Sequence, residues 1–151
     1  MLSSGGIRVS TFNRLDAYKE THIKTASGGK LILMIYNEAI RQLDIALESL
    51  NSGSNRLESV SNSIIKTQDL ITELIVALDF EKGGEIASSL FSLYMYFNQQ
   101  LMEANLNKDA EILNKVKVYM VDLMNAWTQV VAKAGREGSR EGRPGGINIA
   151  G

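Results

Sequence analysis

The chain has 151 residues, a formal net charge of -1 and no cysteine. The missing cysteine excludes disulfides, thiolate zinc sites and iron–sulfur clusters, and the balanced charge argues against a nucleic-acid binder held by phosphate contacts. No apolar run approaches the roughly 18 residues of a membrane span, and residues 1–10 lack the apolar core of a signal peptide, so we expect one soluble domain in the cytoplasm.

Breaker residues gather at the two ends of the chain. The only proline is Pro144, and six of the 13 glycines lie between residues 135 and 151. Charged, glycine-rich sequence of this kind buries too little apolar surface to fold, so residues 135–151 are predicted to be a disordered tail. Residues 1–10 are predicted to be flexible for the same reason, which leaves residues 29–134 as the folded domain.

Residues 11–28 are predicted to form an N-terminal arm. Their apolar residues are too sparse for a helix of the main fold, and an isolated helix of this length is marginal in water. A short helical turn or an extended arm that covers the folded domain fits this pattern better. The apolar residues of the arm are Phe12, Leu15, Tyr18 and Ile23.

The first helix is predicted over residues 29–50, and the second begins near residue 55. The second has the clearest pattern, because its seam positions alternate between spacings of three and four residues, which is typical of a heptad. Asn55 followed by Glu58 predicts a capping box at its start. The seam positions are Leu57, Val60, Ile64, Thr67, Ile71, Leu74 and Leu78.

The third helix is predicted over about residues 84–105, and the fourth over about residues 108–134, with Gly135 expected to end it. All the connections between the four segments are short, so consecutive helices must run antiparallel. The sequence therefore predicts an all-α fold, an antiparallel up-down-up-down four-helix bundle, over residues 29–134.

No arrangement of residues typical of catalysis or metal binding is recognisable. His22 is the only histidine, the Glu-x-x-His motif of di-metal bundles is absent, and no phosphate-binding glycine loop occurs. The glycine pairs at 28–29 and 83–84 precede predicted helices, where backbone N–H groups can hold an anion, but two glycines alone are more typical of a flexible helix start. We therefore expect no enzyme activity, no cofactor and no metal site.

The third predicted helix is apolar around most of its circumference. A bundle helix needs one apolar stripe, so a second apolar face must be covered by the N-terminal arm, by another copy of the chain, or by a partner segment. Either this helix is the most central one and the arm covers its remaining face, or it lines a groove for an amphipathic helix or an extended peptide. The apolar residues are Leu90, Phe91, Leu93, Tyr94, Met95, Tyr96, Phe97, Leu101 and Met102.

The segment GGEIASSLFSLYMYF, residues 83–97, resembles the signature of the flagellar secretion chaperones, the FliS family that binds flagellin. Further similar residues follow in consistent order along the chain, among them Leu15, Tyr18, Tyr36, Asn37, Lys66, Gln68, Ala104, Asn105, Ala126 and Trp127. The sequence departs from the family pattern at Gly28, where proline is common, at Ser89 in place of asparagine, and at Met95 in place of aspartate. Met95 adds apolar surface where the family usually carries a charge.

The resemblance implies a cytoplasmic export chaperone that binds the disordered C-terminal segment of flagellin, prevents its premature polymerisation and aids flagellar type III secretion. It also implies that the N-terminal arm is a plug, in which Leu15 and Tyr18 cover part of the groove; fixed core packing is the alternative role for these two residues. The alternative function is a self-associating structural or adaptor bundle without flagellin binding. We expect a monomer or weak homodimer, with other flagellar export or regulatory proteins as further candidate partners.

The expected flagellin-binding groove draws on the second and third predicted helices. Its residues are Ile65, Gln68, Ile75, Leu93, Tyr94, Phe97 and Leu101. Tyr94, Phe97 and Leu101 also lie on the predicted seam, so about half of the set is expected to contact the ligand and the rest to be core. The Gln68 amide is expected to bind a ligand backbone, and Asn105 to cap the third helix.

Overall fold

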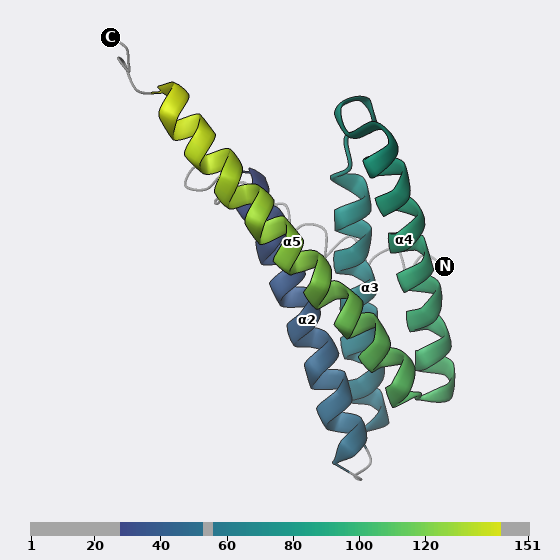
Figure 1. The fold of residues 1–151 in the computed structure, drawn as a ribbon. Coiled ribbons are helices and arrows are strands. Elements are labelled where there is room, and N and C mark those ends of the chain that lie inside the picture. Colours follow the sequence, from purple (N-terminus) through teal and green to yellow (C-terminus); the bar gives the residue numbers. More distant parts are fainter. Residues whose placement is uncertain (1–27, 53–55, 143–151) are drawn as a thin grey trace, which may run out of the picture.

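The structure is a computed structural model that describes residues 28–52 and 56–142, and in this part of the chain it is an antiparallel bundle of four helices (Figure 1). The predicted all-α four-helix bundle is thereby confirmed. The predicted flexible residues 1–10 lie outside the described residues, as does the arm up to residue 27. The helices are α2 (Gly28–Asn51), α3 (Leu57–Val76), α4 (Phe80–Asn107) and α5 (Ala110–Gly142).

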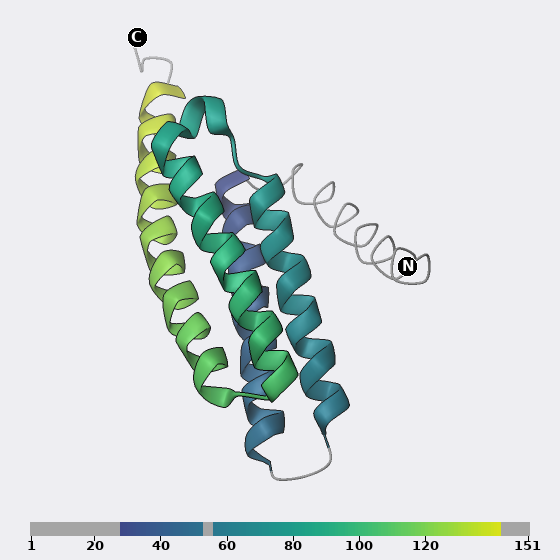
Figure 2. The same ribbon diagram turned by 90° about the vertical axis from the view of Figure 1, so that its right-hand side faces the viewer.

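Helices that are consecutive in the chain are neighbours in the bundle, and α5 closes the ring against α2. The contact between α2 and α3 is the most extensive of the four, and the contact between α4 and α5 is the smallest. Figure 2 shows the four helices running alongside one another, while in Figure 1 the C-terminal half of α5 leans away from α4. The two helices therefore pack mainly near the short connection that joins them.

One hydrophobic core runs through the bundle, with contributions from every helix. Full burial of each large side chain contributes about 1.5–3 kcal/mol, so this core is the main source of stability. The seam predicted for the second helix lies in this core, with two exceptions: Leu57 is 56% exposed at the first turn of α3, and Leu78 is partly buried beyond the end of α3. The largest fully buried side chains are Tyr36, Tyr94, Phe97, Leu43, Ile64, Ile71, Leu74, Leu101, Leu113, Met120 and Glu73.

The start of α3 differs from the prediction. The helix begins after Arg56, whose side chain makes no capping hydrogen bond. The capping box expected from Asn55 stays a prediction, because Asn55 lies outside the described residues. The core contacts of α3 hold its first turn without a cap, since tertiary packing outweighs local signals.

The helix α4 begins at Phe80, four residues before its expected start, because Asp79 caps it. The Asp79 carboxylate accepts hydrogen bonds from the backbone N–H groups of Glu81 at 3.1 Å and Lys82 at 3.0 Å. Gly84 then interrupts the helix with φ 51° and ψ −124°, a conformation that side chains with a Cβ rarely adopt. Gly84 thus separates a short helical turn, which begins at Phe80, from the main part of α4, which begins directly after the glycine pair and close to the predicted start.

The helix α5 continues past Gly135 to Gly142, so the predicted helix end and the predicted disorder of residues 135–142 are wrong. A glycine inside a helix costs only about 1 kcal/mol relative to alanine and does not end the helix by itself. The stronger breaker is Pro144, which disfavours helical backbone at the residue before it. Residues 143–151 of the predicted tail lie outside the described part of the chain.

The C-terminal half of α5 is held against the start of α2 by a close contact at Gly29. A Cβ at this position would lie 2.8 Å from Cγ2 of Val131, so a glycine is needed for the two helices to approach this closely. An ion pair between Lys117 and Asp44, with N–O distance 2.6 Å, joins the same two helices further along. The ion pair holds the N-terminal part of α5 to α2, and the contact at Gly29 keeps α5 with α2 where α5 leaves α4.

Alanine substitution at two glycines should change stability in opposite directions. We expect Gly84→Ala to lower the free energy of unfolding by about 1–3 kcal/mol, because of its positive φ. We expect Gly135→Ala to raise it by about 0.5–1 kcal/mol, because Gly135 is helical and nothing lies within 4 Å of an added Cβ. Urea unfolding measures both, and changes of the same sign would contradict the assigned backbone conformations.

Candidate docking surface

Three of the seven predicted groove residues lie in the core. Tyr94, Phe97 and Leu101 are at most 1% exposed. The Phe97 ring stacks on Tyr119 of α5, with centroids 6.0 Å apart and planes 23° from parallel. These three residues therefore hold α4 against the other helices in this structure and present no surface to a ligand.

Of the other four predicted residues, Ile65, Gln68 and Ile75 belong to α3 and Leu93 belongs to α4. Gln68 is partly buried, and its Nε2 donates a hydrogen bond of 3.1 Å to the backbone carbonyl of Asn98. The amide expected to bind a ligand backbone thus binds the backbone of α4. Ile75 and Leu93 are partly buried against the core, whereas Ile65 is 44% exposed. Of the seven, Ile65 presents the largest apolar surface.

The helix α4 carries a second apolar stripe on its outer side. Phe91, Met95, Met102 and Leu106 are 38%, 50%, 56% and 79% exposed. Their spacings of four, seven and four residues place them on one side of the helix. We call these four residues the α4 outer stripe, and together with Ile65 of α3 the α3–α4 outer face.

Polar contacts beside this face tie α3 to α4. The Ser61 hydroxyl donates a hydrogen bond of 2.9 Å to Oδ1 of Asn105, and Nζ of Lys108 donates to both side chains, at 3.0 Å and 2.8 Å. Asn105 lies inside the last turn of α4, and the C-cap is Lys108 in the left-handed conformation, so the expectation that Asn105 caps this helix is wrong. Because Ile65 lies one turn beyond Ser61 and Met102 one turn before Asn105, the two apolar side chains flank the same seam.

The outer stripe was visible in the sequence only in part. Phe91, Met95 and Met102 belong to the apolar excess of the third predicted helix, but the groove prediction did not select them. Leu106 lies just beyond the predicted end of that helix. A groove defined by the helix face opposite the seam, rather than by the seam itself, would have included all four.

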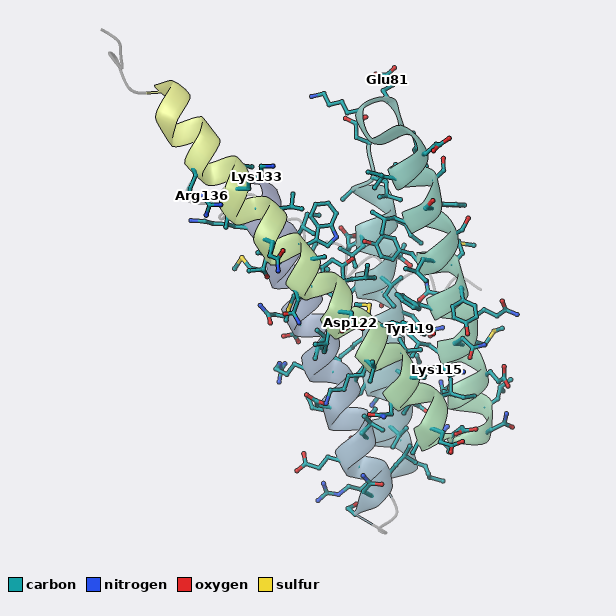
Figure 3. The ribbon with its side chains drawn as sticks, in the orientation of Figure 1. Glu81, Lys115, Tyr119, Asp122, Lys133 and Arg136 are labelled. Atoms are coloured by element: carbon teal, nitrogen blue, oxygen red, sulfur yellow. The ribbon has the colours of Figure 1, made fainter. Side chains whose placement is uncertain are left out.

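The opposite flank of α4, which faces α5, is also partly apolar. Ile86 is 71% exposed and Val130 of α5 is 55% exposed, beyond the point where Phe97 and Tyr119 stack. Charged groups border this region: Figure 3 shows Glu81 at the tip of α4, and Lys133 and Arg136 on the C-terminal part of α5. We call Ile86 and Val130, with the partly buried Leu90, Leu93 and Trp127, the α4–α5 face.

Two tyrosine hydroxyls join α2 to α4 across the inside of the bundle. Tyr36 and Tyr94 are at most 1% exposed, and their oxygens are 2.5 Å apart. Burial raises the pKa of both hydroxyls, while the side chain of Trp127 acts to lower both pKa values. The two tyrosines remain neutral at physiological pH. Their hydrogen bond ties α4 to α2 from inside the bundle, while the two apolar faces of α4 lie outside it.

The tyrosine pair should make stability depend on pH in the alkaline range. An unfolded tyrosine titrates near pH 10, and the folded pKa values are raised, so the stabilising effect is complete below about pH 10 and is lost as pH rises through the folded values. We expect the unfolding free energy to fall above about pH 10, and the Tyr36→Phe, Tyr94→Phe double variant to show a smaller fall. Urea titrations between neutral pH and pH 11 measure this, and identical pH profiles would contradict the assignment.

Substitutions at Phe97 and Met95 test which side of α4 is buried in the core and which side is exposed. Phe97→Ala should lower the unfolding free energy by about 3–5 kcal/mol, because the ring is fully buried. Met95→Ala, at a half-exposed position, should change it by less than about 1 kcal/mol. A small loss at Phe97 would show that its ring lies outside the core in solution.

The described residues contain neither a candidate metal site nor a candidate membrane-spanning helix. Over residues 28–52 and 56–142, no three histidine, cysteine, aspartate or glutamate side chains are grouped so that they could hold a metal ion. In the same part of the chain, none of the helices combines the length and apolar character needed to cross a bilayer. His22 and the predicted plug residues Leu15 and Tyr18 lie outside the described residues.

Comparison with known proteins identifies the family. A family model described as "Flagellar protein FliS" matches residues 11–134. The flagellar secretion chaperone FliS of Bacillus subtilis is 29% identical over 138 residues, 91% of this chain and 97% of that protein. The protein of the same name from Salmonella typhimurium is 34% identical over 122 residues, 80% and 89% of the two chains. That from Campylobacter jejuni is 32% identical over 115 residues, 76% and 88%. The family model covers α2, α3 and α4 entirely, α5 up to residue 134, and the signature of residues 83–97, so the chain belongs to the FliS family of flagellar secretion chaperones.

Proposed function

We propose that this protein is a cytoplasmic export chaperone that binds the disordered C-terminal segment of flagellin, prevents its premature polymerisation and aids its secretion by the flagellar type III apparatus. Membership of the FliS family supports the chaperone role. The observation that carries the proposed docking mode is the α3–α4 outer face, an exposed apolar surface on a stable bundle. The terminal segments of flagellin resemble amphipathic helices without partners, and such a surface supplies what they lack.

The shape of the outer face suits a helical ligand. Phe91 and Leu106 are 15 residues apart, about 22 Å along α4 at 1.5 Å per residue, which corresponds to about four turns of a bound helix. An amphipathic helix that docks on such a surface places apolar residues at spacings of three and four, which match those of the stripe. Met95 and Met102 are unbranched and flexible, so they adapt to different ligand side chains.

The size of the face indicates that the ligand extends beyond it. Folding on binding costs about 2–5 kcal/mol of ordering, and coupled folding typically buries about 1,000–3,000 Å². The outer face alone is smaller than this. We therefore infer that the flagellin segment continues across the tip of α4 and also reaches the α4–α5 face, with Leu93 beneath it.

The N-terminal arm, residues 11–28, is proposed to cover the α4–α5 face in the free chaperone. The described chain begins at Gly28, and Gly29 lies against α5 near the end where Ile86 and Val130 are exposed. An arm that starts there needs little length to reach this face. In this proposal Leu15 and Tyr18 occupy the apolar surface until flagellin displaces them.

A charge on the outer stripe should weaken flagellin binding without unfolding the bundle. We expect Met95→Glu to raise the Kd for a synthetic C-terminal flagellin segment at least about tenfold, because docking would bury the new carboxylate. Val118→Glu is the matched control, since Val118 is an apolar residue of α5, also 50% exposed. Calorimetric titration measures both, with circular dichroism as the check of folding. An unchanged Kd for Met95→Glu would place flagellin elsewhere on the protein.

A further inference from the structure

The first turn of α4 bends back toward the outer stripe of the same helix. On an uninterrupted helix, Phe80 and Phe91 would lie about 16 Å apart along the axis, because they are 11 positions apart in the sequence. Their ring centroids are instead 6.1 Å apart, with the planes 68° from parallel. The interruption at Gly84 therefore brings the Phe80 ring to Phe91, where the α4 outer stripe begins, and Figure 2 shows the turn bent away from the axis of the main helix.

Hydrogen bonds within the turn hold it in this position. The Asp79 carboxylate accepts from the backbone N–H groups of Glu81 and Lys82, and the N–H of Gly83 donates a 2.7 Å hydrogen bond to the backbone carbonyl of Asp79. The positive φ of Gly84 then sets the direction of the turn relative to the main helix. A residue on a turn held in this way loses little conformational freedom when a ligand contacts it.

The hydrogen bonds between α3 and α4 show which part of α3 lies level with Phe91. Ser61 bonds to Asn105, and Gln68 bonds to Asn98, so seven residues forward on α3 correspond to seven residues backward on α4. A further step of seven residues reaches Phe91 on α4 and residue 75 on α3, one position before the end of that helix. The end of α3 and the start of the outer stripe therefore lie at the same level.

Val76 completes an apolar cluster at this end of the α3–α4 outer face. It is the last residue of α3 and is 64% exposed, and its spacing of 11 residues from Ile65 places both on the same side of the helix. Phe80 and Phe91 are 50% and 38% exposed. We call Val76, Phe80 and Phe91 the aromatic end of the outer face.

We propose that Phe80 is a specificity-determining residue for flagellin, and that the aromatic end receives one bulky apolar side chain of the docked segment. This role rests on the proposed function and adds to it the kind of residue that the segment must present at this point. Because the rings of Phe80 and Phe91 lie at 68° to each other, an inserted side chain can contact both of them. A charged or amide side chain would lose its water here without gaining a hydrogen-bond partner from either ring, so the aromatic end selects for apolar residues.

Truncation of the Phe80 ring should weaken flagellin binding without unfolding the bundle. We expect Phe80→Ala to raise the Kd for a synthetic C-terminal flagellin segment at least about fivefold, because an aromatic contact is removed, and Phe80→Leu to raise it less than about twofold. Val118→Ala, at a half-exposed apolar position of α5, is the control and should leave the Kd unchanged. Calorimetric titration measures the three values, with circular dichroism as the check of folding.

Substitutions at Asp79 test whether the capped turn positions Phe80. Asp79→Ala removes the carboxylate that accepts from the two N–H groups, whereas Asp79→Asn keeps an acceptor there. We expect Asp79→Ala to raise the Kd in the wild-type background and to leave it unchanged in the Phe80→Ala background, with Asp79→Asn close to its parent in both. Equal effects of Asp79→Ala in the two backgrounds would show a role that does not act through Phe80, and would overturn the positioning.

Met95→Glu separates loss of the aromatic end from loss of the whole docking surface. A raised Kd for Phe80→Ala, with no change for Val118→Ala, supports the assigned role of Phe80. If Met95→Glu weakens binding but Phe80→Ala leaves the Kd unchanged, flagellin docks on the outer stripe without using the aromatic end, and only the role of Phe80 is overturned. If neither variant changes the Kd, flagellin docks elsewhere, and the proposed docking mode is overturned as well.

Discussion

The fold and the docking surface both depend on α4 being apolar on more than one side. Its inner face contributes Tyr94, Phe97 and Leu101 to the core, while its outer stripe stays in contact with water. Exposed apolar area of this size costs free energy in solution, at about 25 cal/mol for each Å². The bundle tolerates this cost because the core residues of α4 are fully buried and the bond between Tyr36 and Tyr94 ties the helix to α2.

This arrangement separates stability from binding. The residues that hold the bundle together lie inside it, and the residues proposed to hold flagellin lie on the outer face, so changes in one set leave the other nearly unaffected. Because α4 carries apolar faces on two opposite flanks, two different chain segments can cover them. The N-terminal arm is proposed to cover the flank that faces α5, and flagellin is proposed to cover the flank that faces α3.

The bundle could be predicted from sequence because its signals are long and redundant. Four apolar seams over about twenty residues each outweigh errors at the helix ends, such as the α5 helix that continues past the predicted stop at Gly135. The site was harder to predict, because Phe97 and Met95 are both apolar and only two positions apart. Which of them is buried depends on how α4 is rotated against α3 and α5. That rotation is set by contacts such as Gln68 with Asn98 and Phe97 with Tyr119, which spacing alone does not reveal.

The central claim, that flagellin docks on the outer stripe, can be tested directly by methionine oxidation. Met95 and Met102 are at least half exposed, whereas Met120 is fully buried and serves as an internal reference. Dilute peroxide should oxidise the first two rapidly in the free chaperone, at concentrations low enough for it to be monomeric. With a saturating concentration of a C-terminal flagellin segment, we expect the oxidation of both methionines to slow by about tenfold or more. Unchanged oxidation of Met95 and Met102 in a complex that has demonstrably formed would contradict it.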